Sequence, residues 1–209
     1  MYVMSKFFEL NKSLEGEIVL DCGCGFGRNG LLFRSFVWAK VDDAYLIGCD
    51  IFKEYLIRVK RYNPYDDLVL CDVAYLPFKM GKINHVIASE IIEHLDKNEG
   101  RNFLRNITNL CNGTIVLTTP YFPFEQGIIR NNPYEKHVSF WAEDDFKKAG
   151  FDTEIEGYMK PFTEVIRRFK LGAQASKIAK FLFNGLVCHL VIFRTAKKVS
   201  DGVNNFHQD

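Results

Sequence analysis

The segment Val19-Leu20-Asp21-Cys22-Gly23-Cys24-Gly25-Phe26-Gly27-Arg28 decides the fold of this chain. The apolar run at 18–20 is typical of a buried parallel strand, and it ends at the acid Asp21. Three glycines follow at alternate positions, and a helical pattern begins at Arg28. Glycine allows positive φ angles and a close approach of a ligand to the backbone, and a helix N-terminus offers free N–H groups. The segment therefore predicts a nucleotide-type binding turn between a strand and a helix.

The spacing of Gly23, Gly25 and Gly27 discriminates between ligands. A dinucleotide fingerprint needs a glycine where this chain has Arg28, and the lysine of a phosphate-binding P-loop is missing. The segment VLDCGCGFGR instead resembles the first motif of the class I S-adenosylmethionine (SAM) methyltransferases. The resemblance extends over roughly residues 15–160 and implies SAM as the cofactor.

The composition favours one globular domain. The chain has 209 residues, of which 47% are hydrophobic and 25% charged, and its net charge is +1. Such a balance excludes a whole-protein field that would attract nucleic acid. Six cysteines form no C-x-x-C pair, and no secretory signal or bilayer-length apolar run is visible, so we expect a cytoplasmic protein. We expect a methyltransferase domain over 1–199, with a helical insertion at 160–185 and a flexible tail at 200–209.

Strands alternate with helices along most of the chain, which predicts a parallel sheet. Strands are expected at 18–20, 44–50, 68–72, 83–89 and 113–119, and helices at 4–14, 28–38, 53–61 and 98–110. A further helix is expected at 141–149, and two more strands at 152–159 and 186–195. The resemblance implies an α/β fold with a seven-stranded, mostly parallel sheet, helices on both faces and the last strand antiparallel.

Acids follow three successive predicted strands, at Asp21, Asp50 and Asp72. Ligands of open parallel sheets bind beyond these strand ends. The resemblance implies that Asp50 accepts hydrogen bonds from the ribose, that Asp72 and Val73 lie at the adenine, and that Asp21 orients the turn. The expected cofactor site consists of Asp21, Gly23, Cys24, Gly25, Gly27, Asp50, Ile51, Asp72, Val73 and Glu90.

A second cluster, Glu90-Ile91-Ile92-Glu93-His94, follows the fourth predicted strand. On a helical turn Glu90, Glu93 and His94 share one face, and two carboxylates with an imidazole can hold a divalent cation. The run resembles the E-x-x-E-H of small-RNA 2′-O-ribose methyltransferases. That resemblance implies a Mg or Mn site made of Glu90, Glu93, His94 and His137. The same run also occurs in small-molecule O-methyltransferases, where His137 would be a general base and Glu90 would lie near the methionine part of SAM.

We therefore expect a SAM-dependent methyltransferase acting on a hydroxyl of a small molecule, with His137 and Glu90 as candidate catalytic residues. The alternatives are a metal-dependent RNA 2′-O-ribose methyltransferase and a non-catalytic SAM-binding subunit. The segment at 160–185 is basic and amphipathic, so it could form a lid, contact a membrane surface or bind phosphates. DNA amine methylation is not expected. Its N-P-P-Y motif is replaced by Ser89-Glu90, and the related tripeptides Asn63-Pro64-Tyr65 and Asn132-Pro133-Tyr134 lie elsewhere.

Overall fold

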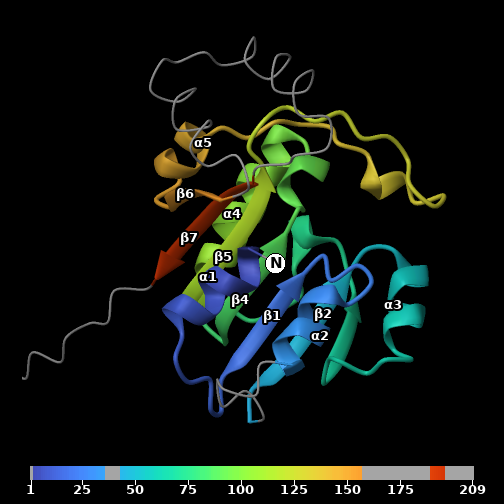
Figure 1. The fold of residues 1–209 in the computed structure, drawn as a ribbon, viewed down its shortest axis with the longest axis vertical. Coiled ribbons are helices and arrows are strands. Elements are labelled where there is room, and N and C mark those ends of the chain that lie inside the picture. Colours follow the sequence, from blue (N-terminus) through green and yellow to red (C-terminus); the bar gives the residue numbers. More distant parts are fainter. Residues whose placement is uncertain (1, 36–42, 157–188, 196–209) are drawn as a thin grey trace, which may run out of the picture.

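The computed structural model of the protein describes residues 2–35, 43–156 and 189–195. The described residues form one seven-stranded sheet with helices on both of its faces (Figure 1). The strand order is β3-β2-β1-β4-β5-β7-β6. Neighbouring pairs from β3 to β5 are parallel, whereas β7 pairs antiparallel with both β5 and β6. The predicted fold class, including the antiparallel last strand, is confirmed.

The helices and strands alternate as the sequence predicts. The strands are β1 (Ile18–Cys22), β2 (Tyr45–Asp50), β3 (Asp67–Leu70), β4 (Ile83–Ser89), β5 (Cys111–Pro120), β6 (Asp152–Glu156) and β7 (His189–Thr195). The α-helices are α1 (Tyr2–Leu10), α2 (Arg28–Ser35), α3 (Lys53–Val59), α4 (Lys97–Leu110) and α5 (Glu143–Lys148). The 3-10 helices among the described residues are η2 (Val73–Tyr75), η3 (Ile92–His94) and η4 (Pro133–Glu135).

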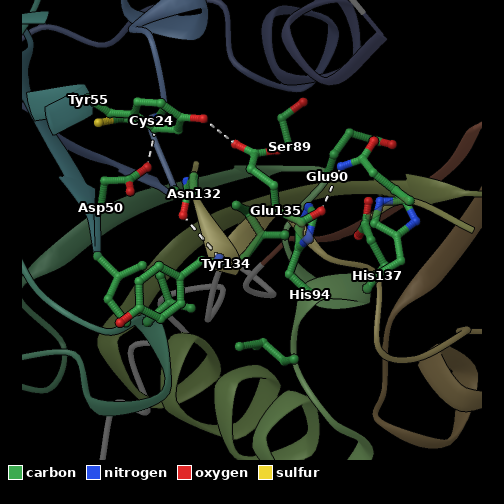
Figure 2. A pocket seen from close by; sticks show the side chains of 18 of the residues that line it. Cys24, Asp50, Tyr55, Ser89, Glu90, His94, Asn132, Tyr134, Glu135 and His137 are labelled. Atoms are coloured by element: carbon green, nitrogen blue, oxygen red, sulfur yellow. Dashed lines mark hydrogen bonds between the residues drawn. The ribbon is translucent and has the colours of Figure 1, made fainter. Parts of the chain in front are cut away.

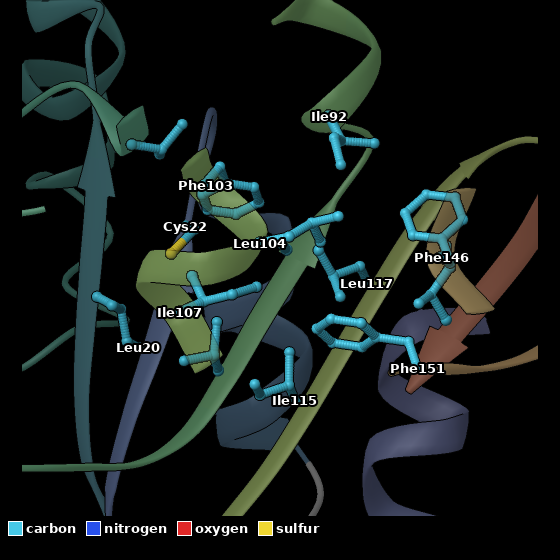
Figure 3. Packing of buried hydrophobic residues seen from close by; sticks show 14 of the residues in the cluster. Leu20, Cys22, Ile92, Phe103, Leu104, Ile107, Ile115, Leu117, Phe146 and Phe151 are labelled. Atoms are coloured by element: carbon cyan, nitrogen blue, oxygen red, sulfur yellow. The ribbon is translucent and has the colours of Figure 1, made fainter. Parts of the chain in front are cut away.

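Each central strand sends alternate side chains into two separate cores, as the pleat of a strand requires. Leu20 of β1 belongs to the core on one face, which extends through Phe103 of α4 to Phe146 of α5 (Figure 3). Val19 packs with Phe7 of α1 and other residues of α1, α2 and α3 on the opposite face. This burial of both faces explains why the central strands are almost continuously apolar in the sequence.

The helix α4 has a well-defined beginning that the sequence encodes. The Asp96 side chain accepts hydrogen bonds from the backbone N–H groups of Asn98 and Glu99, and the Glu99 side chain accepts one from the N–H of Asp96. This reciprocal capping box satisfies N–H groups that the helix itself leaves without a partner. It fixes the point at which the chain leaves the end of β4 and enters the helix.

Several predicted features lie partly or wholly outside the described residues. These are the insertion at 160–185, the tail at 200–209, the end of the predicted helix 28–38 and the first residues of the last strand. The predicted domain boundaries therefore stay a prediction. Within the part of the chain that the structure describes, every helix is too short or too polar to cross a bilayer.

Candidate functional site

The glycine turn between β1 and α2 has the geometry that its sequence predicts. Gly23, Gly25 and Gly27 all have positive φ angles, of 67°, 51° and 77°. A Cβ on Gly23 would lie 1.9 Å from the Cδ1 of Ile91, whereas a Cβ on Gly25 would meet no atom within 4 Å. The turn thus packs closely against the chain after β4 at Gly23 and presents open backbone at Gly25. An open backbone of this kind suits a ligand that approaches the main chain closely.

Asp50 lies at the carboxyl end of β2, beside this turn. Its Oδ2 accepts a hydrogen bond of 2.8 Å from the N–H of Gly25, and its Oδ1 accepts one of 2.8 Å from the N–H of Phe52. Burial raises the pKa of this carboxyl above its usual value, while the two backbone N–H groups oppose the shift. Each oxygen keeps a further lone pair, so the carboxylate can also accept bonds from a pair of ligand hydroxyls.

Asp72 follows β3 and begins the 3-10 helix η2. One of its oxygens accepts a hydrogen bond of 2.8 Å from the N–H of Ala74. The side chain therefore caps this short helix, and Asp72 and Val73 both line the cavity described next. The carboxyl ends of β1, β2 and β3 converge as the three acids predict, although Asp21 has a different environment.

A cavity of about 620 Å³ lies at the carboxyl ends of the parallel strands. This volume is typical of small-molecule and cofactor sites. It is lined by eight of the ten expected cofactor residues: Gly23, Cys24, Gly25, Asp50, Ile51, Asp72, Val73 and Glu90. All four candidate metal ligands also line it: Glu90, Glu93, His94 and His137. The expected SAM site and the expected metal site therefore form parts of one cavity.

Asp21 and Gly27 are not among the residues that line this cavity. Asp21 is fully buried beneath the turn, where it accepts hydrogen bonds from Asn29 and Tyr65. Burial raises its pKa to about 6. Gly27 packs against Val59 and Pro64 on the far side of the turn. Asp21 therefore lies beneath the turn that we expect it to orient. The strand ends at Cys22, two residues later than predicted, so the acid stays inside the strand.

The cluster after β4 does not form the helical turn that the sequence predicts. Glu90 has a φ angle of 55°, a left-handed conformation that is rare for residues other than glycine. The 3-10 helix begins only at Ile92, so Glu90 does not share a helical face with Glu93 and His94. Its carboxylate instead lies 3.0 Å from the Nδ1 of His189 in β7. This departure is a correction to the predicted geometry of the cluster.

Glu93, His94 and His137 come together at one end of the cavity. One ligand atom of each lies within 4.8 Å of the others, and the two imidazole rings are 4.8 Å apart with their planes nearly perpendicular. Figure 2 shows His94 and His137 side by side, with Glu90 above them. His137 comes from the segment between β5 and α5 (residues 121–142), 43 residues after His94. The structure thus unites three of the four predicted ligands.

Backbone carbonyl groups orient both imidazoles. The Nδ1–H of His94 donates to the carbonyl of Lys136 at 3.2 Å, and that of His137 donates to the carbonyl of Phe124 at 2.6 Å. A neutral imidazole bonded in this way keeps a free lone pair on Nε2. Burial lowers the pKa of His94, which favours this neutral form. Carbonyl partners of this kind are typical of histidines that hold metal ions.

The carboxylate of Glu93 is buried without full compensation. Its Oε2 accepts a hydrogen bond of 3.0 Å from Thr119, while its Oε1 has no hydrogen-bond partner among the described residues. Burial and the nearby carboxylate of Glu90 raise the pKa of Glu93 well above its usual value. A buried carboxylate with an unpartnered oxygen beside two imidazole lone pairs fits the ligand set of a divalent cation. The residues present therefore fit the metal that the resemblance implies.

The segment between β5 and α5 closes over the cavity and supplies residues that sequence reasoning missed. Glu135 accepts a hydrogen bond of 2.7 Å from the hydroxyl of Tyr55 on α3 (Figure 2). The backbone N–H of His137 donates to the carbonyl of Gln126. Arg130 lies 4.8 Å above the ring of Phe26 in the glycine turn. The tripeptide Asn132-Pro133-Tyr134 was the available signal, because such a sequence predicts a turn and here begins η4.

Residues 19–113 match the family model of a methyltransferase domain. The described strands form a seven-stranded sheet whose last strand is antiparallel, and the solved structures below share this arrangement. The chain has the fold of the class I SAM-dependent methyltransferases. A curated relative, an uncharacterized protein of Methanocaldococcus jannaschii, is 27% identical over 156 residues. That match covers 75% of this chain and spans 60% of the relative's length.

Solved structures with the same fold include methyltransferases with very different acceptors. The first is a putative methyltransferase in complex with the Trm112 activator of Haloferax volcanii, with a TM-score of 0.61, 15% identity and coverage of 93% and 89% of the two chains. The second is phosphoethanolamine N-methyltransferase 2 of Haemonchus contortus bound to S-adenosylhomocysteine. Its TM-score is 0.60 and its identity 15%, and the match covers 93% of this chain and 52% of that one. The third is the small RNA methyltransferase HEN1. Its TM-score is 0.56 and its identity 16%, and the match covers 93% of this chain and 25% of that one. At these identities the likeness establishes the fold of the methyltransferase domain and leaves its acceptor open.

Proposed function

We propose that this methyltransferase transfers the methyl group of SAM to a hydroxyl of a small molecule, with a divalent cation, Mg²⁺ or Mn²⁺, beside the acceptor. The observation that carries the proposal is the cluster of Glu93, His94 and His137 in the same cavity as the glycine turn. An amine acceptor needs a base to remove its proton or a partner to hold its lone pair in place, and neither task requires a cation. A hydroxyl acceptor gains from nearby positive charge that favours its deprotonated form.

The cofactor would occupy the half of the cavity that the glycine turn forms. Asp50 would accept hydrogen bonds from the ribose hydroxyls, and Asp72 and Val73 would lie at the adenine. When bound, SAM supplies a methyl group on a sulfonium, which is a good leaving group, so positioning of the two reactants accounts for much of the catalysis. The role of the surrounding residues is to hold the acceptor oxygen in line with that methyl group.

The acceptor half of the cavity would be organised by Glu93, His94 and His137. The two imidazoles present Nε2 lone pairs whose direction is fixed by the carbonyl groups of Lys136 and Phe124. Glu93 contributes the negative charge that a cation requires. Glu90 lies at the edge of this cluster, paired with His189, and is the fourth candidate ligand.

The charges around the cavity favour a small acceptor over RNA. The lining includes six carboxylate side chains and a single Arg, Arg28. A strongly negative wall repels a phosphate backbone, whose binding depends on Lys and Arg contacts. Phosphate contacts would have to come from outside the lining, from side chains such as Arg130 or from the basic segment at 160–185, which lies outside the described residues. An RNA 2′-hydroxyl therefore remains the second candidate acceptor.

The test is a methyl-transfer assay with radiolabelled SAM and three sets of acceptors: small phenols and diols, small amines, and a single-stranded RNA with a free 3′ end. Each set is assayed with Mn²⁺ and with EDTA. We expect transfer to a small hydroxyl compound that EDTA and His137→Ala both reduce at least tenfold, while Glu125→Gln, a change at an exposed carboxylate of the same segment, has no effect. Transfer confined to amines, or unaffected by EDTA, would contradict the proposal, and transfer confined to RNA would favour the second candidate.

A further inference from the structure

The tripeptide Asn63-Pro64-Tyr65 lies directly beneath the glycine turn. Tyr65 is 4% exposed, and its ring fills the space that two glycines leave open. A Cβ on Gly30 of α2 would lie 2.5 Å from the ring, and a Cβ on Gly48 of β2 would lie 3.0 Å from it. The absence of side chains at both positions is therefore what admits the tyrosine between the helix and the strand.

The hydroxyl of Tyr65 joins the two ends of the turn. It donates a hydrogen bond of 2.6 Å to the Oδ2 of Asp21, the acid that precedes the turn. It accepts one of 3.1 Å from the N–H of Gly30, in the first turn of α2. The other oxygen of Asp21 accepts a bond of 3.1 Å from Asn29. The strand end and the helix start are thus held together through one phenolic oxygen.

Two further contacts hold the tripeptide against the same elements. A Cβ on Gly27, the last glycine of the turn, would lie 3.4 Å from the Cγ of Pro64. Arg34 of α2 donates a hydrogen bond of 3.2 Å to the carbonyl of Pro64. None of Asp21, Pro64 and Tyr65 lines the cavity, so they reach a bound ligand only through the turn that they support.

We propose that Tyr65 is a positioning residue for the cofactor: by joining Asp21 to Gly30 it holds the glycine turn in the conformation that binds SAM. The inference rests on the proposed function only in its use of SAM, and not on the cation or the acceptor. A ligand that contacts the backbone N–H groups of a turn depends on their fixed positions. Tyr65→Phe keeps the ring that fills the space at Gly30 and Gly48, and it removes only the oxygen.

The test is a calorimetric titration of S-adenosylhomocysteine into the full chain, its Tyr65→Phe variant and its Tyr62→Phe variant. Tyr62 is the matched control because it lies in the same connection and is 60% exposed. We expect Tyr65→Phe to weaken binding about tenfold, since a hydrogen bond to a charged group is lost from the turn, and Tyr62→Phe to leave it unchanged. Urea unfolding of each variant verifies that the protein is folded under the conditions of the titration.

A double-mutant cycle with Asp21→Asn separates positioning from a general loss of stability. If Tyr65 acts through Asp21, Tyr65→Phe should weaken binding less than twofold in the Asp21→Asn background. Parent-like affinity of Tyr65→Phe, or an equal loss in both backgrounds, would overturn the inference. A parent protein that fails to bind S-adenosylhomocysteine would instead contradict the proposed function itself.

Discussion

Glu93 is held where three parts of the chain meet. Its backbone carbonyl accepts hydrogen bonds from the N–H groups of Val138 and Ser139, and its side chain accepts one from Thr119 of β5. These contacts leave one carboxylate oxygen without a partner close to the imidazoles of His94 and His137, with no Lys or Arg ion pair to it among the described residues. A buried acid in such a place costs stability unless a cation or a proton neutralises it. The proposed cation explains why the acid is there.

The sequence predicts the membership of this cluster better than its geometry. The spacing of Glu93 and His94 indicates two adjacent ligands, and the resemblance implies His137 as a further one. The left-handed conformation of Glu90 could not be foreseen, because it depends on a hydrogen bond from its N–H to the carbonyl of Thr118. That bond exists only once β4 and β5 have paired in their observed register.

Gly25 offers a test of the cofactor half of the cavity. Gly25→Ala forces a left-handed alanine at the open part of the turn, where the new methyl group meets no protein atom but enters the cavity. Gly16→Ala is the matched control, since its φ is 70° and it also meets no atom within 4 Å, but it lies outside the cavity. We expect both variants to lose about 1 kcal/mol of stability, as measured by urea unfolding.

Only Gly25→Ala should weaken the binding of S-adenosylhomocysteine, by about tenfold or more, because its methyl group occupies ligand volume. Calorimetric titration of both variants measures this difference. Equal affinities for the two variants would show that the ligand does not approach the turn at Gly25.

At the scale of elements, the segment between β5 and α5 links the two halves of the cavity. On the cofactor side, Glu135 of this segment accepts a hydrogen bond from Tyr55 of α3. On the acceptor side, the segment carries His137. The sequence predicts little of its path, because it has neither helical nor strand periodicity and its turns are fixed by contacts with distant residues. Phe124, near the start of this segment, lines the cavity.

The capping box at the start of α4 should contribute measurably to the free energy of unfolding. Asp96→Ala removes the acceptor for two N–H groups at the start of α4. We expect the free energy of unfolding to fall by about 1 kcal/mol, measured by urea unfolding. Asp144→Ala is the control, because that carboxylate lies near the start of α5 without a capping bond. A loss for Asp96→Ala no larger than for its control would mean that the box contributes nothing to the stability of the fold.

At the scale of the whole molecule, the order of the strands places the chemistry. The sequence predicts the parallel sheet, because short apolar runs alternate with helices and three of the runs are followed by acids, whereas the order of the strands comes from the structure. Parallel strands then bring these ends to one edge of the sheet. The sequence could not show that Asp21 stays buried beneath the glycine turn and does not line the cavity. That outcome depends on Tyr65, whose place in turn depends on glycines at two facing positions, Gly30 and Gly48.

The buried carboxyl of Asp21 makes the stability of the fold depend on pH. Its pKa in the folded state, about 6, lies above the ordinary value of 3.8 for an aspartate, so the folded state binds more protons between these two values. The free energy of unfolding should therefore fall as pH rises from about 4 to 6, and remain lower above that. The fall attributable to Asp21 is about 3 kcal/mol, from a shift of about two pH units.

Urea unfolding of the parent and of Asp21→Asn at several pH values isolates this effect, because other buried acids contribute equally to both. The difference in stability between the two proteins should change across pH 4–6 in favour of Asp21→Asn. A constant difference would mean that Asp21 titrates alike in the folded and unfolded states.

The measurement that tests the central claim most directly is a calorimetric titration of Mn²⁺ into protein saturated with S-adenosylhomocysteine. We expect one cation site per chain, lost in Glu93→Gln and in His137→Ala and retained in Glu125→Gln. No binding by the parent protein, or binding that survives both Glu93→Gln and His137→Ala, would contradict the claim that Glu93, His94 and His137 hold a cation beside the cofactor.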